Sequence, residues 1–224
     1  ATPGGLTADN GVDLAQPKAI LSLPEPKVLA RIKELWHEDR KPADIALVID
    51  TSGSMQDENK LEQAKQGLDA FLGQLSDRDR VAVVSFSDQP TPLSPLTAMN
   101  AAARAALQTT ISGLFPDGGT AVYDATKAGM DMLAADGDPA HIHAVVVLTD
   151  GADNKSSLDL DGLLALLRPS ASGESAVPRV FTIAYGSDAQ ADELKQIAAA
   201  AGGKAYTGDP NTIAQVYTSI SSFF

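Results

Sequence analysis

Two apolar runs, each ending in an aspartate, constrain the fold of this chain more than any other feature. The runs are Ala46–Asp50 and Ala144–Asp150, and a turn that contains glycine follows each of them. Such runs are typical of strands that are buried on both faces, which lie at the centre of a parallel sheet. In the common doubly wound order 3-2-1-4-5-6, strands one and four are neighbours, and the two runs take these positions. We therefore expect Asp50 and Asp150 to face each other at the carboxyl edge of the sheet.

The rest of the chain alternates between strand and helix patterns, which predicts an α/β fold. Apolar residues at intervals of three and four, such as Leu61, Ala64 and Leu68, indicate helices. Further strands are expected at 81–86, 179–185 and 204–207, and helices at 61–75, 100–109, 158–167, 189–201 and 209–224, with one more opening at Thr120. Three prolines within Pro90–Thr97 cannot lie inside a hydrogen-bonded ladder, so this segment is expected to form only a short edge strand.

The expected domain is a doubly wound, Rossmann-like domain over residues 41–224. Its sheet is mostly parallel and six-stranded, with helices on both faces and one short antiparallel edge strand. Residues 1–40 are expected to form an N-terminal linker or extension with one helix at Pro26–Asp39. Because the chain begins at Ala1 rather than at a methionine, we expect it to be part of a longer polypeptide.

Oxygen-bearing side chains gather at three expected turns. Asp50, Ser52 and Ser54 alternate where the first apolar run ends, Thr120 follows Gly118-Gly119, and Asp150 ends the second run. Carboxylates and hydroxyls are ligands for a hard cation, so the set predicts a metal site for Mg²⁺, with Mn²⁺ or Ca²⁺ as alternatives, rather than for zinc.

Local roles compete with metal binding at these positions. Ser, Thr and Asp also cap helices and form turns, although three loops with matching spacing are hard to explain in that way. The nearby acidic residues are expected to form a solvated rim rather than to bind the metal; they are Asp57, Glu58, Asp117 and Asp153. His141 and His143 lack a third ligand nearby in the sequence, so a structural or solvated role is expected for them.

Composition excludes several classes of partner. The net charge of −12 argues against nucleic acids and anionic membranes, which both require clustered Lys and Arg. No apolar run approaches the roughly 20 residues that span a bilayer, so membrane insertion is not expected. The absence of cysteine excludes disulfides, thiolate catalysis and cysteine-ligated zinc.

The motif Asp50-x-Ser52-x-Ser54, with Thr120 and Asp150-Gly151 downstream, resembles the metal-ion-dependent adhesion site (MIDAS) of von Willebrand factor A domains. The resemblance implies that Ser52 and Ser54 bind the metal directly, and that Thr120 does so in the ligand-competent form. Asp50 and Asp150 would often act through water. The implied partner is a protein that presents an Asp or Glu carboxylate to an open coordination position of the cation.

The N-terminal segment resembles bacterial surface proteins that place a solute-binding domain before an A domain. The residues that carry this resemblance are Gly11-Val12-Asp13 and Ala15-Gln16-Pro17, followed by the expected helix. It implies an extracellular or cell-surface location.

Two other functions compete with a binding module. An assembly scaffold for an ATPase-type complex would use the same site, and a metal-dependent hydrolase would use the cation to activate water. Against the enzyme, no lysine or arginine of the motif loops is placed to stabilise a phosphoryl charge, and neither Asp-x-Asp nor Gly-x-Ser-x-Gly occurs. The sequence therefore favours a metal-dependent protein-binding module that is not an enzyme.

Overall fold

Strand β1 (Ala43–Asp50) lies inside the sheet, and all eight of its residues are buried in the computed structural model. The structure describes residues 25, 27–28, 40–135, 138, 140–168, 177–186, 189–209, 212–221 and 223. β1 pairs in parallel with β2 (Arg80–Phe86) on one side and with β4 (Ile142–Thr149) on the other. Beyond β4 the sheet continues in parallel through β5 (Arg179–Tyr185) and β6 (Ala205–Gly208). The order β3-β2-β1-β4-β5-β6 confirms the predicted six-stranded sheet, in which strands one and four are neighbours.

The edge strand β3 (Pro90–Ala98) runs antiparallel to β2, as predicted, but it is nine residues long rather than short. The prolines are tolerated because an edge strand has one side on which no ladder hydrogen bond is needed. The pairing of β3 with β2 is also irregular, which helps to accommodate the prolines: the register shifts between Val81 and Val83 and again between Val83 and Val84.

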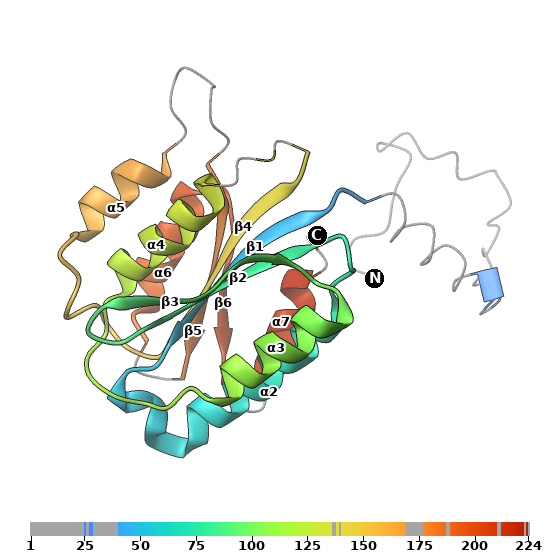
Figure 1. Cartoon of the computed structure of the whole chain (residues 1–224). Helices are drawn as coiled ribbons and strands as arrows, with labels where there is room; N and C mark the ends of the chain where they lie inside the picture. The colour runs from blue at the N-terminus through green and yellow to red at the C-terminus, as the bar shows by residue number, and fades with distance from the viewer. Residues whose placement is uncertain are drawn as a thin grey trace, which may run out of the picture. The chain divides into compact units, whose positions relative to one another are not determined.

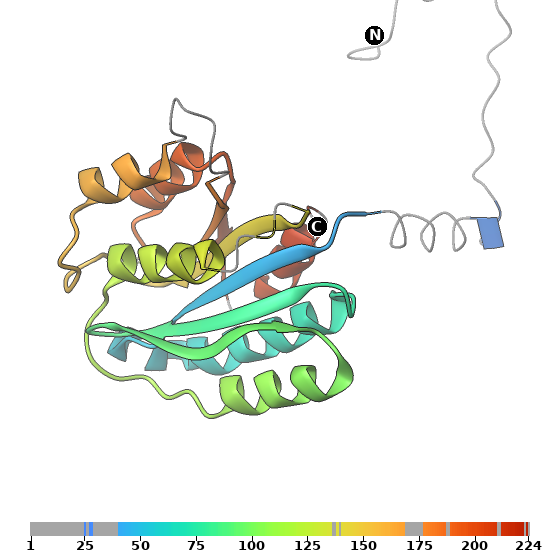
Figure 2. The same cartoon turned by 45° about the horizontal axis from the view of Figure 1, so that its top comes forward.

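Helices cover both faces of the sheet, which confirms the predicted doubly wound fold (Figures 1 and 2). One face carries α2 (Lys60–Gln74), α3 (Ala101–Ser112) and α7 (Ile213–Ser221), and the other carries α4 (Val122–Ala134), α5 (Leu160–Leu167) and α6 (Ala191–Ala200). Side chains of a strand alternate between the faces. In β1, Leu47 and Ile49 therefore enter the first core, and Ala46 and Val48 enter the second.

Element ends differ from the prediction by a few residues. The helix expected to open at Thr120 begins at Val122, and the one expected at Leu158 begins at Leu160, after its cap Asp159.

The helix predicted at Pro26–Asp39 lies outside the described residues, apart from Lys27 and Val28. Residues Arg40–Phe224 form one compact unit, and the extension assigned to residues 1–40 stays a prediction. Among the described residues, no helix combines the length and the apolar character that crossing a membrane requires.

His141 and His143 both lie next to the carboxylate of Asp44, at the amino end of β1. This carboxylate accepts hydrogen bonds from Arg80 Nε at 2.7 Å and from His141 Nδ1 at 2.6 Å, and His143 Nε2 lies 3.3 Å from it. Within the described part of the chain, no three His, Asp or Glu side chains are arranged to hold a metal. Both histidines therefore contact a buried carboxylate at the edge of the sheet opposite Asp50.

Candidate metal centre

The first site loop leaves β1 at Asp50 and turns at once into the 3₁₀ helix η2 (Gly53–Asn59). Asp50 Oδ1 accepts a hydrogen bond of 2.7 Å from the backbone N–H of Ser52, which fixes this turn. The hydroxyls of Ser52 and Ser54 lie 3.1 Å apart, and Ser54 Oγ donates to Asp150 Oδ1 at 2.7 Å. The turn after β1 and the end of β4 are thus joined through side-chain oxygens.

A second loop brings Thr120 to the same edge of the sheet. Its backbone binds the first loop, because Asp117 N donates to Thr51 O at 2.7 Å and Gly53 N donates to Gly118 O at 3.1 Å. Gly118 has a φ of +75°, a backbone conformation that glycine adopts most readily. At Gly119 an added Cβ would lie only 2.6 Å from Lys155 Cε, so a larger residue would clash there.

The side chain of Thr120 is buried next to the loop that follows β4. A Cβ added at Gly151 would lie 3.4 Å from Thr120 Oγ1. The structure therefore places all the predicted site residues at one edge of the sheet; their role as metal ligands stays a prediction.

Asp50 is fully buried, and the hydrogen bonds to its carboxyl come from neutral groups, Thr149 Oγ1 at 2.5 Å and Ser52 N. Burial raises the pKa of Asp50 to about 6, and the charge of Asp150 adds to the rise. The hydrogen bonds from Thr149 and Ser52 oppose this rise of the pKa but do not cancel it. A cation at this position would favour the ionised form of the carboxyl.

Lys60 is a site residue that the sequence reasoning missed. Its ammonium donates to Asp150 Oδ2 at 2.8 Å, and the residue is buried. The sequence reasoning considered only lysines and arginines of the motif loops, whereas Lys60 reaches the site from the first residue of α2. Its spacing was a usable signal: Lys60 lies one turn before Ala64 and two before Leu68, on the apolar side that packs on the sheet.

The acidic rim is only partly as predicted. Asp57, Glu58 and Asp117 are exposed. Asp153 is instead half-buried and organises the start of α4, since it accepts hydrogen bonds from Tyr123 N and from Ser156 Oγ. Such binding of backbone N–H groups is the usual work of an acid at a helix N-terminus.

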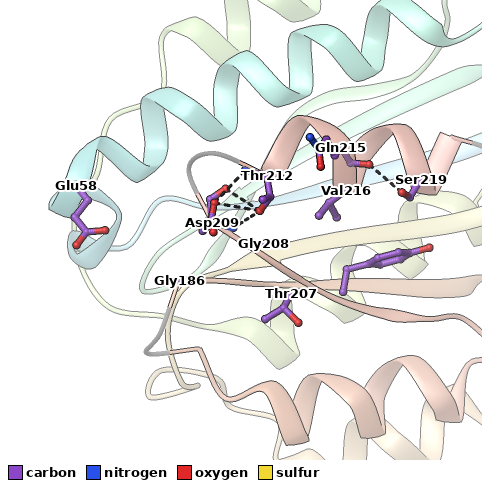
Figure 3. Close-up of a pocket in the computed structure, with 10 residues that line it drawn as sticks. Glu58, Gly186, Thr207, Gly208, Asp209, Thr212, Gln215, Val216 and Ser219 are labelled. Carbon is purple, nitrogen blue, oxygen red and sulfur yellow. Dashed lines mark hydrogen bonds between the residues drawn. The ribbon is translucent and has the colours of Figure 1, made fainter.

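A cavity of about 700 Å³ opens at the carboxyl ends of β5 and β6, beside the site (Figure 3). Glu58 of η2 and Gly186 after β5 line it, together with Asp209 and Thr212, which hydrogen-bond to each other before α7. A Cβ at Gly186 would lie 3.3 Å from Lys60 Cε. The side chain of Lys60 therefore lies close to Gly186, which lines the cavity, while its ammonium binds Asp150.

The donor set fits a hard divalent cation. Ser52, Ser54 and Thr120 offer neutral oxygens, and Asp50 and Asp150 offer carboxylates that are fully buried. Another buried hydroxyl lies on β5, next to β4: Tyr185 Oη has no hydrogen-bond partner among the described residues. Burial, with the charges of Asp209 and Asp150, raises the pKa of Tyr185 to about 12, so this group stays neutral.

Comparison with known proteins identifies the family. A family model for the von Willebrand factor type A domain matches residues 44–218. The chain belongs to this family. An uncharacterised protein of Synechocystis is 28% identical to this A domain over 209 residues, which cover 92% of this chain and 46% of that protein. A UPF0353 protein of Mycolicibacterium paratuberculosis is 30% identical over 189 residues, covering 75% of this chain and 56% of the relative. The chain spans about half the length of these relatives.

Solved structures share the fold of this A domain. A von Willebrand factor type A protein from Catenulispora acidiphila superposes with a TM-score of 0.70 at 23% identity, over 81% of this chain and 42% of that one. Proximal thread matrix protein 1 from the mussel byssus, in a structure with a zinc-occupied MIDAS motif, gives a TM-score of 0.65 at 21% identity, over 82% and 46%. The corresponding domain of the pili tip protein Mfa5 from Porphyromonas gingivalis gives 0.64 at 16% identity, over 82% and 95%.

Proposed function

We propose that this A domain is a cation-dependent protein-binding module rather than an enzyme. Ser52, Ser54 and Thr120 would hold Mg²⁺ directly, and Asp50 and Asp150 would act through water. The bound cation would supply an electrophilic position for an Asp or Glu carboxylate of the partner.

One observation carries the proposal: hydroxyls of the turn after β1 reach a buried carboxylate that follows β4, beside a second buried carboxylate. The loop that holds Thr120 is hydrogen-bonded through its backbone to both of these segments. Ser52 Oγ, Ser54 Oγ and Asp150 Oδ1 form a chain with steps of 3.1 and 2.7 Å. Buried carboxylates are costly unless they are paired or coordinate a metal. A cation would compensate Asp50, whose hydrogen-bond donors are neutral.

The charge of the chain gives the cation a second role. A protein with net charge −12 repels acidic partners, and the exposed Asp57, Glu58 and Asp117 increase the repulsion around the site. A divalent cation reverses the local sign at the point of contact. When the carboxylates act through water, the ion retains affinity for an external carboxylate.

The cation assignment is tested by calorimetric titration of chelator-stripped protein with Mg²⁺. We expect one site in the wild-type chain and none in Asp50→Ala. Asp69→Ala is the matched control, because Asp69 is exposed on α2 outside the donor set. Wild-type binding strength in Asp50→Ala would refute the assignment.

The partner assignment is tested separately, by capture from cell-surface extract. Specific bands should disappear in EDTA and in Ser54→Ala. Phe115 is 72% exposed in the loop that leads to Thr120, so Phe115→Ser should weaken capture while leaving the titration with Mg²⁺ unchanged. Bands that persist in EDTA would point to another surface.

The surrounding context is also a proposal. We place the domain on the exterior or surface of a bacterial cell and within a longer polypeptide. The similarity in fold to a pili tip domain supports this location.

A scaffold for an ATPase-type complex is the alternative to a surface binding module. The full reading frame distinguishes the two functions, since a secretion signal before Ala1 would exclude the scaffold. A hydrolase is the third candidate, and Mg²⁺-dependent turnover of a phosphate ester would favour it.

A further inference from the structure

The backbone before α2 is shaped so that it buries Lys60. Glu58 and Asn59 have φ of 52° and 57°, and in the described part of the chain they are the only non-glycine residues with positive φ. L-residues rarely adopt this conformation, which persists where the surrounding structure requires it. Directly after this bend, the side chain of Lys60 is only 6% exposed and its ammonium lies 2.8 Å from Asp150 Oδ2.

The two site carboxylates differ in the charge of their hydrogen-bond donors. Asp150 receives a charged donor on Oδ2, from Lys60, and a neutral donor on Oδ1, from Ser54. The hydrogen bonds to Asp50 come from Thr149 and from a backbone N–H, which carry no charge. The lysine therefore compensates one of the two negative charges beside the candidate cation.

We propose that Lys60 is a positioning residue that holds Asp150 Oδ2 away from the cation and limits the negative charge around it. This inference rests on the cation site of the proposed function. With Lys60 present, Asp150 can offer the ion only Oδ1 or a bridging water. The cation is then bound less tightly but remains more electrophilic toward the partner's carboxylate.

Lys60 also sets which cation is preferred. Ca²⁺ takes six to eight oxygen ligands and accepts bidentate carboxylates, whereas Mg²⁺ keeps several waters and needs few carboxylates. Removing the ammonium frees both oxygens of Asp150 and removes one positive charge near the ion. Lys60→Met should therefore bind Ca²⁺ about tenfold more tightly or better, with a smaller gain for Mg²⁺, because the nearby positive charge is lost.

The experiment is calorimetric titration of wild-type protein, Lys60→Met and Lys65→Met with Mg²⁺ and with Ca²⁺. Lys65 is the matched control, since it is also a buried lysine of α2, but its ammonium binds Glu62 and the carbonyls of Ser112 and Leu114. Lys65→Met changes the net charge equally and should leave the ratio of Ca²⁺ to Mg²⁺ affinity as in the wild type.

Each outcome decides one proposal. Tighter cation binding and a raised preference for Ca²⁺ in Lys60→Met alone support the role of Lys60. Equal or weaker binding with an unchanged preference overturns it, since a merely structural lysine would not move the preference. If Lys60→Met does not fold in EDTA, Lys60→Leu, which also has no donor for Asp150, is judged by the same criterion. If the wild type binds neither ion, the proposed function itself fails.

Discussion

Thr149 holds Asp50 in place through a single hydrogen bond. Its hydroxyl donates to Asp50 Oδ2 at 2.5 Å, and both residues are fully buried. Thr149→Val keeps the shape of the side chain but leaves the carboxyl without this donor. An unsatisfied buried acceptor costs about 1–3 kcal/mol, so we expect a loss of that size in the free energy of unfolding. Binding of Mg²⁺ should weaken as well, as measured by urea unfolding and calorimetry.

Thr182 provides the control for this substitution. It is also fully buried in the sheet, and its hydroxyl donates to Leu194 O at 2.9 Å, away from the donor set. Thr182→Val should lower stability by a similar amount and leave Mg²⁺ binding unchanged. Equal weakening of Mg²⁺ binding by both variants would mean that Thr149 acts through general stability.

At the scale of elements, α2 and α7 pack closely at a glycine. A Cβ at Gly67 would lie 3.1 Å from the ring of Tyr217, whereas a Cβ at Gly73 in the same helix meets nothing within 4 Å. Gly67→Leu should lower the free energy of unfolding by about 1–3 kcal/mol through overpacking. Gly73→Leu should raise it by up to about 1 kcal/mol through helix propensity. Urea unfolding of the pair tests this, and equal effects would contradict tight packing of α7.

A helix or strand can be predicted from the sequence when the residues that determine it lie within the element itself. β5 has the predicted bounds because an apolar run between turn formers contains its own signal. The length of β3 was underestimated because its irregular pairing with β2 is set by tertiary contacts. The placement of Asp50 and Asp150 at one edge of the sheet could be predicted because parallel strands bring their carboxyl ends to the same edge. Lys60 was missed because the backbone bend at Glu58 and Asn59 could not be predicted from the sequence, although the spacing of Lys60 from Ala64 and Leu68 indicated the apolar side of the helix.

At the scale of the whole molecule, the sheet has a candidate cation site at one edge and buried ion pairs at the other. Asp44 pairs with Arg80, and Asp79 pairs with Arg40. Burial alone would raise the pKa of Asp44, but hydrogen bonds from Arg80 and His141 outweigh it and hold the pKa below 3.8. Burial acts on Asp79 in the same way and is outweighed by Arg40 and by backbone N–H groups, so this pKa also lies below 3.8.

These lowered pKa values determine how stability depends on pH. A carboxyl whose pKa is lower in the folded than in the unfolded chain contributes stability above the unfolded pKa, and this contribution is lost as pH falls through the folded pKa. Asp44→Asn breaks a buried pair and should cost about 3–5 kcal/mol at neutral pH. The difference from the wild type should shrink below pH 3.8, as Asp44 becomes protonated in the wild type. Urea unfolding over this pH range measures the difference.

The control is Asp131→Asn, which removes an exposed pair with Lys127 on α4. Exposed pairs contribute about 0–1 kcal/mol, so this variant should follow the wild type at every pH. If Asp44→Asn instead cost the same at neutral pH and well below pH 3.8, its effect would come from packing and not from charge. In that case the pair of Asp44 with Arg80 would not contribute to the expected loss of stability in acid, and the ionised Asp79 would be the remaining candidate.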